Sequence, residues 1–247
     1  MKKKLNTLLQ LVQLRVLGYF PGYPILKRTD TCKVEILADK DFQQSCREVN
    51  RFTCLDTPRL ANLWNLCRHT NPQGGILEVG SFRGGGALHL SNSSPGRRII
   101  LCDSFEGFEL LDPVVDRSFS YEMFKNTSHQ NVDRLFAGRE LDYKILAGFF
   151  PAVCQKEKFD LGRLSFVHLD VDAYKPTIES LEYLDPFMME RSLMVLDDYH
   201  RETDGVTQAV REFTSRNRAW TAFPLFPAQG LLVHESWFDK NGPPLSI

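Results

Sequence analysis

The sequence lacks a surplus of charge, any long apolar run and any close pairing of cysteines. Its 247 residues carry 30 Lys and Arg against 31 Asp and Glu. Because nucleic-acid binding needs a basic surplus, we expect no nucleic-acid partner. No apolar stretch reaches the ~18 residues of a membrane-spanning helix, so we expect no stable membrane span. The six cysteines form no C-x-x-C pair and no metal-type spacing, which fits reduced thiols in the cytoplasm.

Two common nucleotide-binding motifs are also missing. Residues 75–87 read GILEVGSFRGGGA, an apolar run typical of a buried strand, followed by a glycine turn and the start of a helix. The turn is neither G-x-G-x-x-G nor a phosphate loop with G-K-[ST], which disfavours a dinucleotide or ATP. Glu78, just before the turn, suits a ligand with an ammonium group and a ribose, such as S-adenosylmethionine. The alternative is an ordinary tight strand-to-helix turn.

Further apolar runs along the chain predict six more strands. We expect them at residues 98–103, 143–147, 164–172, 192–196, 219–225 and 230–234. Helices are expected at 57–69, before the first strand, and at 175–184 and 206–213, between later strands. In the first helix, Thr57 is the expected N-cap. The alternation predicts an α/β protein with a doubly wound parallel sheet and helices on both faces, in which the last two strands pair antiparallel. Ligands bind such sheets at the carboxyl ends of the strands.

Acidic residues close several of these strands. Asp103 follows Glu78 by 25 positions and suits the hydroxyls of a ribose; the alternative is a solvated carboxylate at a strand end. Asp170, Asp172, Asp197 and Asp198 converge if the fourth and fifth strands are neighbours. Four carboxylates repel each other unless a cation cancels their charge, and Mg²⁺ prefers oxygen ligands. We therefore predict a metal site, whereas the alternative is that these acids cap the following helices.

The first 50 residues have a different character. Leu5, Leu8, Leu9 and Val12 share one face of an amphipathic segment after three lysines. This segment is expected either to pack on its own domain or on a dimer partner, or to touch a membrane surface. Residues 18–50 mix Gly, Pro and charge and are expected to connect and fold over a site. We therefore divide the chain into an N-terminal helical extension or lid, 1–50, and a main domain, 51–247.

Four segments taken together resemble one known family. EVGSFRGGG, LCDSFEGF, LDVDAYKPT and VLDDYH, in this order, are similar to the macrocin O-methyltransferase (TylF-type) family of Mg-dependent enzymes that methylate sugar hydroxyls of natural products. The resemblance covers about residues 50–235. It implies a Rossmann-like class I methyltransferase fold with seven strands, the last antiparallel, and S-adenosylmethionine bound over the glycine turn.

The resemblance also implies roles for individual residues. The cofactor would lie against Glu78, Gly80, Ser81, Arg83, Gly84, Gly85, Asp103, Ser104 and Phe105, and we add Gly148 and His168, although His168 inside a strand also fits a packed core residue. Asp170, Asp197 and Asp198 match the metal ligands, and Asp172 the general base. Arg83 is expected to pair with Glu78 or a cofactor carboxylate, or to be solvated.

These residues predict a specific reaction. Two vicinal hydroxyls of a small-molecule or glycan acceptor would bind Mg²⁺, and Asp172 would take the proton of the hydroxyl to be methylated. His200 is the rival base. Two other functions remain as alternatives. A nucleotide-sugar or dinucleotide oxidoreductase would need G-x-G-x-x-G and a Tyr-x-x-x-Lys pair, which are missing where expected. A non-enzymatic cofactor-binding scaffold would have lost the strand-end acids, which are present.

Overall fold

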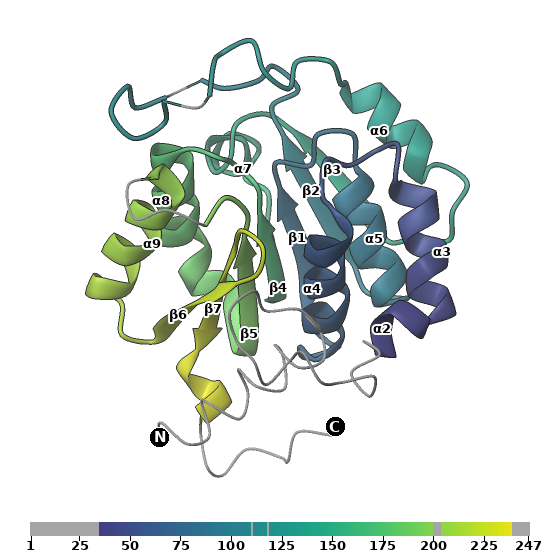
Figure 1. Cartoon of the computed structure of the whole chain (residues 1–247). Helices are drawn as coiled ribbons and strands as arrows, with labels where there is room; N and C mark the ends of the chain where they lie inside the picture. Colours follow the sequence, from purple (N-terminus) through teal and green to yellow (C-terminus); the bar gives the residue numbers. More distant parts are fainter. Residues whose placement is uncertain (1–34, 110, 118, 200–203, 239–247) are drawn as a thin grey trace.

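The computed structural model describes residues 35–109, 111–117, 119–199 and 204–238 (Figure 1). Within this part of the chain a seven-stranded sheet runs in the order β3-β2-β1-β4-β5-β7-β6. The strands are β1 (Gly75–Val79), β2 (Ile99–Asp103), β3 (Tyr143–Ala147), β4 (Leu164–Leu169), β5 (Met188–Leu196), β6 (Trp220–Leu225) and β7 (Gln229–His234). β7 pairs antiparallel with β5 and β6, while the other pairs are parallel. The expected doubly wound sheet with its antiparallel last strand is confirmed.

Helices cover both faces of this sheet (Figure 1). They are α2 (Glu35–Ala38), α3 (Lys40–Val49), α4 (Thr57–Arg68), α5 (Gly85–Ser93), α6 (His129–Phe136), α7 (Ala152–Glu157), α8 (Tyr174–Leu184) and α9 (Gly205–Arg216), with short 3₁₀ turns at Asp185–Phe187 and Glu235–Phe238. Buried side chains of α3 to α6 form one core with alternate residues of the strands. Those of α7, α8 and α9 form a second core on the opposite face. Alternate residues of each strand therefore belong to different cores.

Some element ends differ from expectation, and three of these differences have a clear structural reason. The N-cap of α4 is Asp56, whose carboxylate accepts from the Arg59 N–H at 3.0 Å, so Thr57 is already helical. β4 ends at Leu169, because the chain turns at Asp172, which has a left-handed φ of 59°. β5 begins at Met188, four residues before the expected Ser192. Glu190 and Arg191 interrupt the apolar pattern at its start. The backbone is also irregular there, with a left-handed φ of 58° at Arg191.

The N-terminal region is described only from residue 35. The amphipathic segment at Leu5–Val12 lies outside the described residues. In α3, Phe42 and Val49 are buried in the same core as α4 and α5. Ser45 also hydrogen bonds to His89 of α5 at 2.8 Å. The domain boundary at residue 50 stays a prediction. Among the described helices, none has both the length and the apolarity needed to cross a membrane.

Candidate active site

Strands β1, β2 and β4 meet closely where each ends. Gly80 follows β1 with a φ of 85°, and a Cβ on it would lie 1.8 Å from the Asp170 carbonyl oxygen. The Gly80 N–H donates to Cys102 O at 2.9 Å, and the Asp170 N–H donates to Val79 O at 2.8 Å. Only glycine permits this approach, because any side chain would collide with backbone. The first glycine of the turn therefore brings Glu78, Asp103 and Asp170 to one edge of the sheet.

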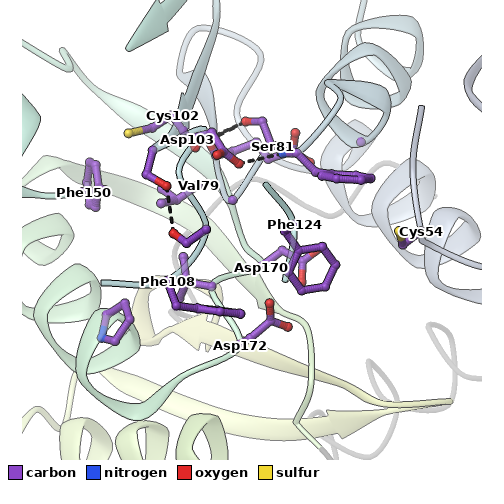
Figure 2. A pocket seen from close by; sticks show the side chains of 18 of the residues that line it. Cys54, Val79, Ser81, Cys102, Asp103, Phe108, Phe124, Phe150, Asp170 and Asp172 are labelled. Carbon is purple, nitrogen blue, oxygen red and sulfur yellow. Dashed lines mark hydrogen bonds between the residues drawn. The ribbon is translucent and has the colours of Figure 1, made fainter. Parts of the chain in front are cut away.

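A cavity of about 340 Å³ opens at this edge (Figure 2). The predicted site residues that line it are Glu78, Gly80, Ser81, Asp103, Ser104, Gly148, Asp170, Asp172 and Asp198. Lining residues that sequence reasoning did not name come mostly from residues 52–59 and from the loop after β2. The cavity lies at the carboxyl edge where ligands of parallel sheets bind.

Asp103 is held rigidly at the end of β2. Its Oδ2 accepts from the Phe82 N–H and its Oδ1 from the Phe105 N–H, each at 2.7 Å. Burial raises the pKa of this carboxyl, although the two backbone hydrogen bonds oppose the shift. Each carboxylate oxygen keeps a second lone pair, so Asp103 can still accept hydrogen bonds from a ligand hydroxyl. Ser104 donates to Gly107 O at 2.9 Å and thereby shapes the following loop.

Arg83, Gly84, Gly85 and Phe105 stand behind the cavity wall rather than on it. A Cβ on Gly84 would lie 2.9 Å from Val132 of α6. Gly85 donates its N–H to Phe52 O at 3.0 Å. The Arg83 guanidinium lies over the Phe82 ring, 4.8 Å from its centroid. Of the alternatives for Arg83, an ion pair with Glu78 is not found among the described residues. The Phe105 ring packs edge-on against His129. These residues shape the glycine turn, and none of them lines the cavity.

His168 lies beneath the cavity and joins two carboxylates. Its Nδ1 is 2.9 Å from Glu78 Oε1, and its Nε2 is 2.6 Å from Asp197 Oδ2. Because both ring nitrogens face carboxylate oxygens, both donate and the ring is an imidazolium. Burial alone would lower the pKa of His168, but the hydrogen bonds and charges of Asp197 and Glu78 outweigh it and raise the pKa to about 10. His168 thus supports the site from below and does not itself line the cavity.

Asp197 has two further partners that sequence reasoning missed. Arg59 Nη1 donates to its Oδ1 at 2.9 Å, and Gln229 Nε2 donates to its Oδ2 at 2.9 Å. The Asp197 side chain has no exposed surface. Burial would raise the pKa of this carboxyl, but the His168 hydrogen bond, with the His168 and Arg59 charges, lowers it. Asp197 is therefore ionised, and each of its two oxygens has at least one protein partner.

The other acids gather at the cavity. Oxygen atoms of Asp170, Asp172 and Asp198 all lie within 4.8 Å of one another. Asp172 and Asp198 have left-handed φ angles of 59° and 57°, which fold both strand ends towards the same point. Burial and the neighbouring negative charges raise the pKa of Asp170 and Asp172 well above the usual range. Asp170 also groups with His168 and Asp197. Three of the four strand-end acids thus meet at the cavity, while Asp197 approaches Asp170 alone among them.

Such a cluster suits a hard cation. Three carboxylates this close need a proton or a cation between them. Oxygen donors are what Mg²⁺ prefers, and it needs only a few carboxylates besides water and substrate oxygens. Of the predicted ligand set, Asp170 and Asp198 face the cavity, whereas Asp197 presents its oxygens to Arg59, His168 and Gln229. The cluster of Asp170, Asp172 and Asp198 therefore fits a hard divalent cation such as Mg²⁺. His200, the rival base, lies outside the described residues.

Aromatic rings from the loop after β2 cover the cavity. Phe108 packs against Phe119 and Phe124 at centroid distances of 5.5 and 5.9 Å. Phe108 and Phe124 lie on the side of the cavity where Asp170 and Asp172 are found (Figure 2). Buried Asp116 anchors the loop, because its Oδ1 accepts from the Tyr174 N–H at the start of α8 at 3.0 Å. The loop after β2 thus contributes an aromatic roof to the cavity.

Comparison with known proteins decides the family. The family model described as Macrocin-O-methyltransferase (TylF) matches residues 36–224. The chain belongs to this family. The 8-demethyl-8-(2,3-dimethoxy-alpha-L-rhamnosyl)-tetracenomycin-C 4'-O-methyltransferase of Streptomyces olivaceus is 27% identical over 157 residues, which cover 58% of this chain. The match spans only 59% of that relative's length.

Solved structures of O-methyltransferases share the fold of this TylF-family chain. NovP superposes with a TM-score of 0.60 at 20% identity, over 74% of this chain and 82% of NovP. An O-methyltransferase from Bacillus cereus, in complex with SAH, gives a TM-score of 0.53 at 14% identity, over 79% of this chain and 91% of its own. At these identities the likeness concerns the fold, and it agrees with the strand order of the sheet.

Proposed function

We propose that this TylF-family protein transfers a methyl group from S-adenosylmethionine to a hydroxyl of a sugar or a sugar-containing natural product, with the help of a divalent cation. The observation that carries this proposal is the meeting of a glycine turn, the acids Glu78 and Asp103 and a cluster of three aspartates around one cavity. These residues suit a methyl donor that carries a ribose and an ammonium group. They also suit an acceptor with two neighbouring hydroxyls.

Glu78 offers a site for the cofactor's ammonium group. Its Oε1 accepts from His168, while its Oε2 is buried and has no hydrogen-bond partner among the described residues. A buried acceptor without a partner is costly, so a bound donor would relieve that cost. Asp103 has free lone pairs for the ribose hydroxyls, and Gly80 leaves room for close approach. We therefore place the methionine end near Glu78 and the ribose near Asp103.

Asp170 and Asp198, with Asp197 beside them, would hold the cation, and Asp172 would act as base. A bound Mg²⁺ would supply positive charge that lowers the pKa of a coordinated hydroxyl. Asp172 would accept the hydroxyl proton as the oxygen attacks the methyl carbon, and the carbon–sulfur bond of the donor would break to release S-adenosylhomocysteine. A carboxylate oxygen of Asp172 lies within 4.8 Å of oxygens of both Asp170 and Asp198, which would place this base beside the coordinated hydroxyl. His200 is the alternative base.

The acceptor is expected to be a deoxysugar carried on an apolar group. The relative from Streptomyces olivaceus is named for methylation of a rhamnosyl unit on tetracenomycin C. In this chain, Phe108, Phe119 and Phe124 would cover the apolar faces of such a molecule. We further propose that residues 1–50 form an extension that helps a homodimer assemble, and that the protein works in the cytoplasm.

The test uses the full chain and labelled S-adenosylmethionine with a panel of rhamnosides, other glycosides and catechol-like diols. We expect label transfer with Mg²⁺, loss after EDTA and recovery when Mg²⁺ is restored. Asp172→Asn should lower turnover far more than cation affinity, whereas an unchanged rate would move the base role to His200. Full activity in EDTA would remove the cation from the mechanism. Binding of NADP instead of S-adenosylmethionine would favour the oxidoreductase alternative.

A further inference from the structure

Arg59 in the first turn of α4 reaches from the cavity wall to the end of β5. Its Nη1 donates to Asp197 Oδ1 at 2.9 Å, and its Nη2 donates to Cys54 O at 3.1 Å. Its Nε also lies 3.4 Å from Asp56 Oδ1. The side chain is 21% exposed and lines the cavity. One guanidinium therefore connects residues 54–56 of the wall to a carboxylate of the proposed cation site.

Arg59 contacts Asp197 Oδ1, which has a single hydrogen-bond partner among the described residues. Asp197 Oδ2 is already shared between His168 Nε2 at 2.6 Å and Gln229 Nε2 at 2.9 Å. Oδ1 receives Arg59 alone among the hydrogen bonds of the described residues. A cation that takes Asp197 as a ligand would therefore approach Oδ1, where it meets a fixed positive charge. Like charges this close repel strongly at a partly buried site.

We propose that Arg59 is a positioning residue that competes with the divalent cation for Asp197 Oδ1, an inference that rests on the proposed function. Without the cation, Arg59 neutralises the buried carboxylate. When the cation binds, the guanidinium gives up Asp197 and keeps Cys54 O and Asp56. Because the same side chain holds residues 54–56, cation binding is thereby coupled to the cavity wall that faces the acceptor.

The chain offers a matched control on the same helix. Arg68 lies nine positions further along α4 and pairs with Asp39 at 3.2 Å, with its side chain 49% exposed. It does not line the cavity. Arg68→Gln removes the same charge from the same helix without touching the site. Arg59→Lys keeps the charge but loses the forked geometry that reaches Asp197 and Cys54 together.

The experiment is a calorimetric titration of Mn²⁺ into the wild type, Arg59→Gln, Arg59→Lys and Arg68→Gln, each checked for folding by circular dichroism. We expect Arg59→Gln to bind Mn²⁺ at least about tenfold more tightly, since one repelling charge is removed. Arg59→Lys should gain less, and Arg68→Gln should match the wild type. If Arg59 only stabilised the cavity wall, its replacement would leave the Mn²⁺ affinity unchanged or reduced.

Equal or weaker Mn²⁺ binding by folded Arg59→Gln overturns the inference. If Arg59→Gln does not fold, the test rests on Arg59→Lys. In that case, an Arg59→Lys protein that binds Mn²⁺ no more tightly than the wild type overturns the inference. Absence of Mn²⁺ binding in every protein overturns both this inference and the cation in the proposed function. If the wild type binds Mn²⁺ and the Arg59 variants bind it with the same affinity, only the inference about Arg59 is overturned. The proposed function stands or falls separately, because methyl transfer is measured in its own assay.

Discussion

Gly86→Ala offers a sharp test, because helix propensity and packing predict opposite signs. Gly86 is in the first turn of α5, where alanine would ordinarily favour the helix by up to about 1 kcal/mol. In the folded protein, however, the added Cβ would lie 2.1 Å from Glu78 Oε1 and 3.1 Å from its Cδ. The Glu78 carboxylate cannot retreat freely, because Oε1 is bound to His168 at 2.9 Å.

The magnitude follows from these contacts. Overpacking of a well-packed core costs about 1–3 kcal/mol. Losing a hydrogen bond to a charged group costs about 1.5–3 kcal/mol. After the helix-propensity gain, we expect Gly86→Ala to lower the free energy of unfolding by about 3 kcal/mol. Because Glu78 is displaced, the affinity for S-adenosylmethionine should fall as well.

Urea unfolding and calorimetric titration with S-adenosylmethionine measure the two effects. Gly75→Ala is the control, because its Cβ would meet no atom nearer than Leu164 Cδ2 at 3.4 Å, an ordinary contact. The control should stay within about 1 kcal/mol of the wild type. A Gly86→Ala protein as stable as the wild type, with unchanged cofactor affinity, would refute both the tight packing around Glu78 and its role in cofactor binding.

Three further changes test other parts of the structure. Asp197→Asn should lower the free energy of unfolding by about 3–5 kcal/mol in urea titrations, because it leaves the charges of buried His168 and half-buried Arg59 without their carboxylate; a loss below about 1 kcal/mol would contradict the pairing. His89 is neutral because burial lowers its pKa to about 4 from the ordinary 6.5. Between pH 6.5 and 4, therefore, only the unfolded state takes up that proton. Over this range the free energy of unfolding of the wild type should fall by about 3 kcal/mol more than that of His89→Gln. Equal losses in the two proteins would contradict a neutral His89. Asp116→Ala should free the aromatic roof from α8, seen as faster proteolysis within residues 108–124 and weaker S-adenosylmethionine binding; unchanged cleavage would count against the anchor.

The sequence predicts most of the strands because their signals are local. Buried apolar runs such as residues 76–79 and 164–169 end abruptly in a glycine turn or an acid. In the parallel part of the sheet these ends must share an edge, so the meeting of Asp170 with Asp198 was predictable from topology. The start of β5 was not, because Glu190 and Arg191 interrupt the apolar pattern.

The partners of Asp197 are harder to read from the sequence. Arg59 and Asp197 are 138 positions apart, and an arginine in the first turn of a helix is usually solvated. Gln229 begins a strand, where nothing local distinguishes a buried amide from an exposed one. For Arg83, Gly84 and Gly85, the glycine-rich pattern correctly located the turn. It could not tell which residues face the cavity and which face Phe52 and α6.

The most direct measurement is a calorimetric titration of the full chain with S-adenosylmethionine and, in parallel, with NADP. We predict a single site for S-adenosylmethionine, also filled by S-adenosylhomocysteine, and no heat from NADP. Saturable binding of NADP without binding of S-adenosylmethionine would contradict the assignment of the cavity at the ends of β1, β2 and β4.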